Sequence, residues 1–516
     1  MSVYKNGGVI ILDFGSQYTQ LIARKIRELN VYSSILSHDS PFEDIMRYKP
    51  KAIILSGGPS SVYENNAPAY DNRILNIDLP ILGICYGLHI LAHHSGGSVK
   101  STGQGEYGFA EISITEETDF LQSDLNGSQV WMSHMDQVTK VPNSWSVIAE
   151  SSNGVVAAMA SNNLKRLATQ FHPEVSHTEH GIIMLKNFLF KIALCKNDWT
   201  PGNFIEQQVN MIRDEVGNKN VLIGVSGGVD SSVVAAIMNE AIGEQAKAVL
   251  IDHGLMRKNE ASDCIHALKD GLGVNIHLED RSDIFFDKLS GITDPEQKRK
   301  IIGNQFIYSF ESVASRFSNM DYLAQGTLYP DVIESGISHG KAAHVIKSHH
   351  NVGGLPEDMK FKLIEPLREL FKDEVRNVGK ELGLPEKLIN RHPFPGPGLG
   401  VRIIGEVTTH RVAILQEADA IYLDVLEKEG LYDEIWQAFA ILIPVRTVGV
   451  MGDQRTYENL LGLRAVTSTD GMTADWYRMP SEVLSKISNN IVNSVKGINR
   501  VTYDVTSKPP GTIEWE

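Results

Sequence analysis

Residues 226–232 of this 516-residue chain read Ser-Gly-Gly-Val-Asp-Ser-Ser, and this stretch decides the fold of the middle of the chain. The apolar run 221–225 precedes it and a helical pattern, 231–242, follows it. The pattern predicts a strand, a tight loop and a helix, because glycines let the backbone turn sharply. Loop N–H groups, serine hydroxyls and the positive end of the helix dipole would together bind a polyanion.

This loop lacks the Gly-Lys-Ser/Thr sequence of a Walker loop. It resembles the pyrophosphate-binding loop of enzymes that cleave ATP between the α- and β-phosphates. The resemblance implies that ATP is bound by Ser226, Gly227, Gly228, Val229, Asp230, Ser231 and Ser232. Asp230 is also a candidate ligand for the Mg²⁺ of ATP, with a helix N-cap as the alternative role. The alternative for the whole loop is a Gly/Ser turn that opens an ordinary helix.

The composition is that of a globular protein with several domains. Hydrophobic residues make up 42% of the chain, and 48 Lys and Arg against 63 Asp and Glu give a net charge of −15, which argues against nucleic acid as the main partner. The cysteines Cys85, Cys195 and Cys264 are far apart, so neither a disulfide framework nor a zinc site is indicated. Without an apolar stretch of about 18 residues no membrane span is expected, and we expect a reducing, cytoplasmic setting.

Three regions follow one another along the chain. Strand and helix patterns alternate in residues 1–198 and again in 199–391, which predicts two successive α/β domains. In residues 392–516 the alternation is no longer strict, which predicts a small α+β domain. The Pro- and Gly-rich segment 392–400 cannot be a regular helix or a central strand, so we expect a structured joint there.

Cys85 is a candidate nucleophile in the first domain. It lies in Gly83-Ile-Cys-Tyr-Gly87, between an apolar run and a helical pattern, which is the arrangement of a nucleophile elbow. A helix N-terminus favours the reactive thiolate. Without the flanking glycines, a small buried apolar residue would be the better interpretation.

A cysteine nucleophile needs a base and a group that orients this base. In Phe171-His-Pro-Glu174 the proline favours an extended backbone, so His172 and Glu174 can share a face. The segment Leu55-Ser-Gly-Gly-Pro-Ser-Ser61 offers the N–H groups of Gly57 and Gly58 to an oxyanion, together with that of Tyr86. A plain turn is the alternative for Gly57 and Gly58.

These three motifs, in this order, resemble those of class I glutamine amidotransferases. The resemblance spans nearly the whole first domain. It implies that Cys85 attacks the glutamine side-chain amide, that His172 acts as base and then acid, and that Glu174 orients it. Met132-Ser-His-Met-Asp136 also fits a loop of this family near the site.

Over its full length the chain resembles the glutamine-hydrolysing GMP synthetase family. The segments that carry this resemblance are 251–260, 325–331, 347–354, 392–400 and 508–516. It implies that ammonia from glutamine aminates xanthosine monophosphate (XMP) after adenylation by ATP, with Mg²⁺ and without an organic prosthetic group. It also implies an adenine-nucleotide α-hydrolase-like second domain, and XMP contacts from Arg500, Lys508, Ile513 and Glu514. For Lys508 a solvated tail position is the alternative.

Two further expectations concern the charged segment 294–304 and the last domain. A solvated helix face is the simplest interpretation of 294–304, and the family resemblance implies a lid over the adenylate there. The same resemblance implies homodimerisation through residues 392–516.

Three other functions compete with this one. A related ligase, of the NAD or argininosuccinate synthetase kind, shares the loop but usually lacks this amidotransferase and this C-terminal tail. A tRNA-modifying enzyme of the same ATP-binding class would often need paired cysteines and a basic surface. A non-catalytic protein with decayed sites is disfavoured by the intact Cys85, His172 and Glu174.

Overall fold

The computed structural model describes residues 7–163, 165–317, 319–337, 361–451, 453–468 and 473–516. The predicted motif segment 347–354 lies outside them. The chain divides into two compact units, Met1–Phe204 and Ile205–Glu516. Each is described by itself, and the division into three domains expected from sequence remains a prediction.

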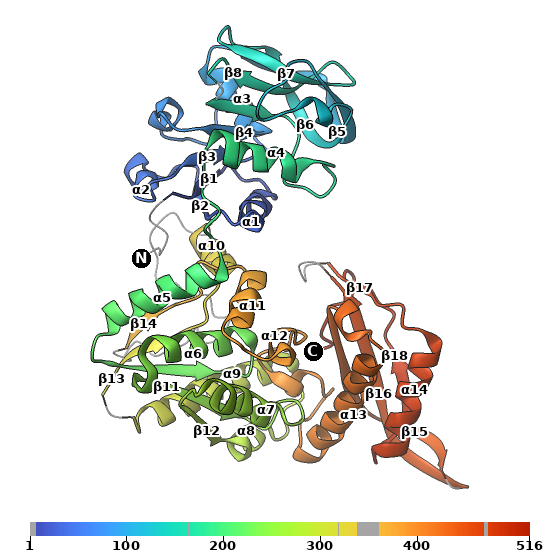
Figure 1. The fold of residues 1–516 in the computed structure, drawn as a ribbon. Coiled ribbons are helices and arrows are strands. Elements are labelled where there is room, and N and C mark those ends of the chain that lie inside the picture. The colour runs from blue at the N-terminus through green and yellow to red at the C-terminus, as the bar shows by residue number, and fades with distance from the viewer. Residues whose placement is uncertain (1–6, 164, 318, 338–360, 452, 469–472) are drawn as a thin grey trace. The chain divides into compact units, whose positions relative to one another are not determined.

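The described residues of the first unit form a nine-stranded sheet in the order β2-β1-β3-β4-β9-β8-β7-β5-β6 (Figure 1). Pairing is parallel from β2 to β9 and antiparallel from β9 to β6. The strands are β1 (Val9–Asp13), β2 (Ser33–Ser37), β3 (Ala52–Leu55), β4 (Ile81–Ile84), β5 (Ser98–Ile114), β6 (Gln129–Lys140), β7 (Trp145–Ser151), β8 (Val156–Ser161) and β9 (Arg166–Thr169).

The central strands of this sheet are buried on both faces because helices pack against it. Every residue of β3 and β4 is buried, as expected for parallel strands covered by helices. The helices are α1 (Thr19–Glu28), α2 (Phe42–Met46), α3 (Tyr86–His94) and α4 (Gly181–Asn187), the last running on into a π-helical turn, Phe188–Ile192. The predicted α/β fold is confirmed here.

The described part of the second unit contains a five-stranded, fully parallel sheet in the order β12-β11-β10-β13-β14. The chain winds outward in both directions from β10, so the strand order reverses between β10 and β13. Ligands of open α/β sheets bind at the carboxyl ends of strands at such a switch point. The strands are β10 (Asn220–Val225), β11 (Ala246–Asp252), β12 (Ile276–Asp280), β13 (Met320–Ala324) and β14 (Lys362–Ile364).

Two helices of this sheet begin at the switch point. These are α6 (Val229–Ile242), after β10, and α10 (Tyr329–Ile337), after β13. The other helices around it are α5 (Pro201–Val216), α7 (Glu260–Ile265), α8 (Ser282–Leu289), α9 (Pro295–Ala314), α11 (Lys372–Glu381) and α12 (Glu386–Ile389).

The C-terminal part of the second unit is a smaller sheet with two helices packed against it (Figure 1). The strands β15 (Gln437–Met451) and β16 (Gln454–Thr467) form a long antiparallel hairpin, and β16 also pairs with β17 (Asp475–Trp476) and, in parallel, with β18 (Ile498–Tyr503). The helices are α13 (Thr409–Lys428) and α14 (Ser481–Ser494). This is the mixed α+β arrangement that the sequence predicts.

The Pro- and Gly-rich joint is ordered by buried contacts. The ring of His392 stacks on Tyr432 at 3.8 Å, its Nδ1 accepts from the N–H of Ala438 (3.1 Å), and its Nε2 lies 2.9 Å from the Tyr432 carbonyl. The accepting Nδ1 requires a neutral ring that donates from Nε2. Burial lowers the pKa of His392 to about 4. Gly398 is required because a Cβ there would lie 2.3 Å from the carbonyl oxygen of Leu255.

The expected solvated helix face at 294–304 is wrong for one residue. Asp294 caps α9 by accepting from Gln297 N (2.8 Å), but Lys298, one turn on, is fully buried. Its ammonium pairs with Glu516 and donates to the carbonyl of Ile403 (2.7 Å). A buried charge needs such partners, and they come from distant parts of the sequence.

Among the described residues, no helix combines the length and the apolar character needed to cross a bilayer.

Candidate functional site: a cysteine elbow and an anion-binding loop

Cys85 lies in a strained turn between β4 and α3. Its backbone has φ 51° and ψ −102°, a conformation that is uncommon for a residue with a side chain. Such strain costs on the order of 1–3 kcal/mol and persists where the surroundings impose it. The turn places the sulfur at the N-terminus of α3, as expected for a nucleophile elbow.

The glycines on either side of Cys85 are required by close backbone packing. A Cβ on Gly83 would lie 2.5 Å from the carbonyl group of Gly87. A Cβ on Gly87 would lie 2.4 Å from the carbonyl oxygen of Leu55, at the end of β3. The Gly-x-Cys-x-Gly spacing therefore follows from the tight packing of the turn against the sheet.

His172 and Glu174 form the buried pair that the sequence predicts. Nδ1 of His172 lies 2.7 Å from Oε1 of Glu174, and both side chains are almost fully buried. Burial disfavours the charged imidazolium, but the Glu174 carboxylate and a hydrogen bond with Cys85 outweigh it and raise the pKa of His172 to about 10. The ring is therefore a positively charged imidazolium at neutral pH, protonated on both nitrogens.

Gln170, beside the sulfur, and its partner His89 were not predicted. The amide nitrogen of Gln170 lies 3.8 Å from Cys85 Sγ, and its Oε1 lies 2.9 Å from His89 Nε2. Both side chains are buried, and burial lowers the pKa of His89. The sequence offered one signal for each residue. Gln170 lies two residues before His172, and His89 lies one helical turn after Cys85.

The predicted oxyanion-binding segment lies beside the same sulfur. A Cβ on Gly57 would stand 3.6 Å from Cys85 Cβ and 3.2 Å from His172 Cε1, so the Gly57 backbone adjoins both side chains. Tyr86 is the first residue of α3, and N–H groups of a first helical turn have no partner within the helix. Gly58 packs instead against the carbonyl of Phe14, 2.6 Å from where its Cβ would be.

The loop 226–232 has the predicted strand–loop–helix form. β10 ends at Val225, Gly228 is the N-cap of α6, and Gly227 has φ 79°. The Ser231 hydroxyl accepts from Ser226 N (3.1 Å) and donates to the Gly228 carbonyl (3.1 Å). Ser232 also donates to Gly228 (2.9 Å). The loop is thus closed by its own hydroxyl groups.

The N-cap alternative for Asp230 is wrong, because Gly228 occupies that position. Oδ2 of Asp230 pairs with Lys372 Nζ at 2.5 Å, from the first turn of α11. Oδ1 is buried and has no hydrogen-bond partner among the described residues. A carboxylate with one unsatisfied oxygen fits the role of a metal ligand. The described residues contain no cluster of three or more His, Cys, Asp or Glu side chains placed to hold an ion.

The four residues nominated for XMP have different surroundings. Ile513 packs in a small apolar core with Phe439 and Ile441. Glu514 is bound by the fully buried Arg402 (2.8 and 3.1 Å) and by Gln437 (2.8 Å). These contacts tie the tail to the sheet.

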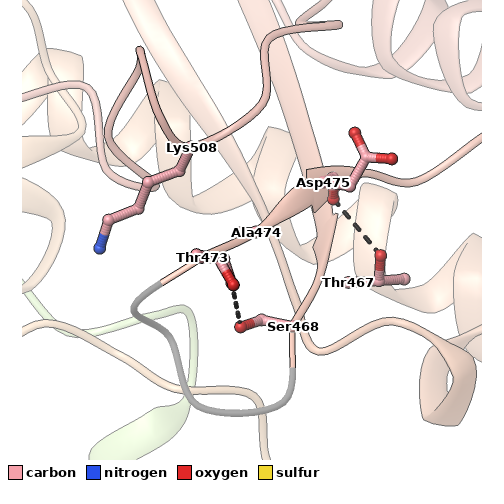
Figure 2. A pocket seen from close by; sticks show the side chains of 6 residues that line it. All are labelled: Thr467, Ser468, Thr473, Ala474, Asp475 and Lys508. Carbon is pink, nitrogen blue, oxygen red and sulfur yellow. Dashed lines mark hydrogen bonds between the residues drawn. The ribbon is translucent and has the colours of Figure 1, made fainter. Parts of the chain in front are cut away.

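Lys508 lines a pocket of about 450 Å³ (Figure 2). Its backbone forms a bridge with Ala474 (2.7 and 3.1 Å), and in Figure 2 its side chain extends away from Asp475. The lining residues are Thr467, Ser468, Thr473, Ala474, Asp475 and Lys508. Arg500 is not among them: it lies on β18 and donates to the carbonyl of Val448 (3.4 Å).

Three family models match successive parts of the chain. Residues 10–192 match the class-I glutamine amidotransferase model, 202–301 match NAD synthase, and 424–515 match the GMP synthase C-terminal domain. The match to NAD synthase covers the anion-binding loop, and the amidotransferase match covers the cysteine elbow together with the His172–Glu174 pair.

Full-length relatives carry one common name, GMP synthase [glutamine-hydrolyzing]. The protein of Brachyspira hyodysenteriae is 54% identical over 98% of this chain and 99% of its own length. That of Chlorobium chlorochromatii is 54% identical over 98% and 99%, and that of Bacillus subtilis 52% identical over all of both chains. The chain belongs to the glutamine-hydrolysing GMP synthase family.

Proposed function

We propose that this chain makes GMP by aminating XMP, with glutamine as the source of ammonia and ATP as the activating substrate. One observation carries the proposal: a Cys85–His172–Glu174 arrangement and a pyrophosphate-type loop occur in a single chain. The full-length relatives and the three family models support the same assignment.

The proposed glutamine step uses the charge state of His172. Because the pKa of His172 is raised to about 10, its ring is an imidazolium beside Cys85, and the thiolate is the reactive form of a cysteine. The thiolate attacks the side-chain amide carbon, and the imidazolium protonates the nitrogen that leaves as ammonia. His172 thus acts first as acid and then as base, the reverse of the order that the family resemblance implies. The neutral imidazole then takes a proton from water, which hydrolyses the thioester to glutamate. The backbone N–H groups of Gly57, Gly58 and Tyr86 stabilise the oxyanion.

The proposed synthetase step takes place at the switch point of the parallel sheet. The O2 atom of XMP attacks the α-phosphorus of ATP, and the bond to the β-phosphate oxygen breaks. Pyrophosphate stays in the loop 226–232, where backbone N–H groups and the α6 dipole hold it. Ammonia then displaces AMP from C2 and gives GMP.

The residues of the loop fit a magnesium ion bound with ATP. Asp230 would hold it through the unsatisfied Oδ1, and Mg²⁺ would neutralise charge on the phosphates.

XMP recognition by Arg500, Lys508, Ile513 and Glu514 remains a proposal. We place the phosphate in the Lys508 pocket. The backbone bridge between Lys508 and Ala474, next to β17, fixes the segment that carries the ammonium group. We also propose a homodimer through residues 392–516, supported by exposed apolar side chains on the β15–β16 hairpin: Val445, Val448, Val450 and Tyr457. A cytoplasmic location would fit substrates that are metabolites of that compartment.

The products test this function. Incubation with XMP, ATP, Mg²⁺ and glutamine should yield GMP, AMP, pyrophosphate and glutamate in equal amounts. ADP and orthophosphate in place of AMP and pyrophosphate would refute the role of the loop. Turnover with nicotinate adenine dinucleotide or citrulline in place of XMP would favour the related ligases.

A further inference from the structure

Arg391, outside the predicted site residues, holds the carbonyl of the anion-binding loop. Its Nη1 donates to the carbonyl oxygen of Gly227 (2.8 Å), and its Nη2 pairs with Glu260. The side chains of Arg391 and Glu260 are 16% and 5% exposed. One guanidinium group therefore bridges the loop after β10 and the start of α7.

Glu260 is fixed by a second contact. Its Oε2 accepts from the backbone N–H of Arg257 (2.7 Å), and its own N–H donates back to the Arg257 carbonyl (3.1 Å). A buried carboxylate with both oxygens bound cannot move without leaving charges unpaired. Arg391 is consequently held in one orientation toward the loop.

Gly227 is fitted to this ion pair. Its φ of 79° is a conformation that favours glycine. A Cβ at this position would stand 3.1 Å from Met256 Cε and 3.2 Å from Glu260 Oε1. The loop thus packs directly against the pair.

The orientation of the Gly227 carbonyl determines what the loop offers to an anion. In a trans peptide the C=O of one residue and the N–H of the next point in opposite directions, and the cis peptides of the described residues are confined to 508–510. With the Gly227 oxygen held by Arg391, the Gly228 N–H points away from Arg391. If that peptide flipped, a carbonyl oxygen would face the phosphates and repel them.

We propose that Arg391 is a positioning residue that turns the Gly227–Gly228 peptide so that its N–H group, and not its carbonyl, faces the pyrophosphate of ATP. Glu260 keeps the Arg391 guanidinium group on the carbonyl of Gly227 and away from the phosphates. This inference rests on the proposed function, since it concerns how that function binds ATP.

Arg213 offers a matched control at the C-terminal end of α6, the helix that begins in the loop 226–232. Its guanidinium donates to the carbonyls of Ala241 (2.8 Å) and Glu240 (3.0 Å), in the last turn of α6. Arg213→Met removes the same kind of contact from α6 without touching the loop.

The test measures ammonium-driven GMP synthesis by the full chain. Arg391→Met should raise both KM for ATP and the inhibition constant of pyrophosphate about tenfold, which is about 1.4 kcal/mol. KM for XMP, glutamine hydrolysis and the kinetics of Arg213→Met should stay within about twofold of wild type. The proposal would be overturned if KM for ATP and KM for XMP rose equally in Arg391→Met. It would also be overturned if Arg213→Met raised KM for ATP as much as Arg391→Met does.

Arg391→Lys keeps the test valid if Arg391→Met fails to fold. The lysine retains the charge pair with Glu260 but cannot donate to two acceptors in the forked geometry of a guanidinium. KM for ATP should rise by roughly threefold or more, because one hydrogen bond is lost, while the thermal midpoint stays that of wild type. Wild-type KM for ATP in this variant contradicts the inference. A wild-type enzyme that forms no GMP at all would instead refute the proposed function.

Discussion

The protonated state of His172 depends on Glu174, and Glu174→Gln tests this dependence. The substitution keeps the size of the side chain and removes its charge. Burial is already the largest single effect on the ring, and it opposes the imidazolium; without the carboxylate it is no longer outweighed. The amide can also donate to Nδ1, which would select the wrong tautomer of the ring.

The structure gives the size of this effect. Glu174 and Cys85 together outweigh burial and raise the pKa of His172 from 6.5 to about 10, which is roughly 5 kcal/mol of preference for the protonated ring. If about half of this reaches the transition state, the loss is about 2.5 kcal/mol, or roughly 70-fold in rate. We therefore expect glutamine hydrolysis to fall at least that far.

Alkylation of Cys85 by iodoacetamide is the direct assay, followed by mass spectrometry between pH 6 and 9. Wild type should react at a rate that changes little over this range, because His172 stays an imidazolium throughout it. The Glu174→Gln enzyme should react slowly at pH 6 and faster as the pH rises. Burial raises the pKa of Cys195 to about 12 and that of Cys264 to about 11, so both stay protonated and report little.

Glu179→Gln is the matched control, since Glu179 lies in the same unit and its side chain is exposed. It should behave as wild type. A Glu174→Gln enzyme with wild-type turnover and a wild-type alkylation profile would refute the reasoning about His172.

Three further changes have defined outcomes. Gly83→Ala places a Cβ 2.5 Å from backbone, so glutamine hydrolysis should be lost and the first unit destabilised by about 2–4 kcal/mol in a denaturant titration; wild-type stability would show that the turn can relax. Asp230→Asn should abolish ammonium-driven GMP synthesis and leave glutaminase intact, and full activity would exclude a metal role for its Oδ1. His392 has its pKa lowered to about 4, so its contribution to stability is complete above pH 6.5 and is lost as the pH falls toward 4, by roughly 3 kcal/mol. Unfolding of His392→Asn should show a smaller acid dependence than wild type over that window, and identical slopes would contradict the assignment.

Strands of the parallel sheets could be predicted because their sequences are continuous apolar runs. Val221–Val225 and Ile81–Ile84 are recognisable in this way, and the structure places strands there. The hairpin of β5 and β6 was not predicted. Its strands carry Gly103, Gly105 and Gly108 and alternate buried with exposed residues, so no apolar run marks them.

Local motifs gave the candidate sites, because the elbow, the loop and the His172–Glu174 pair each lie within a few residues of sequence. The partners of buried charges could not be found in this way. Lys298 pairs with Glu516, 218 positions away, and Arg402 with Glu514, 112 positions away. The sequence around Lys298 is that of a solvated helix, and only tertiary packing shows that its ammonium is buried.

The central claim is that one chain joins an ammonia-producing cysteine site to a separate ATP-dependent synthetase site. The most direct measurement is GMP formation by Cys85→Ala, with glutamine or with ammonium as the nitrogen source. The account predicts that glutamine supports no GMP formation and that ammonium supports the wild-type rate. GMP formation from glutamine by this variant, or loss of both activities in a folded protein, would contradict it.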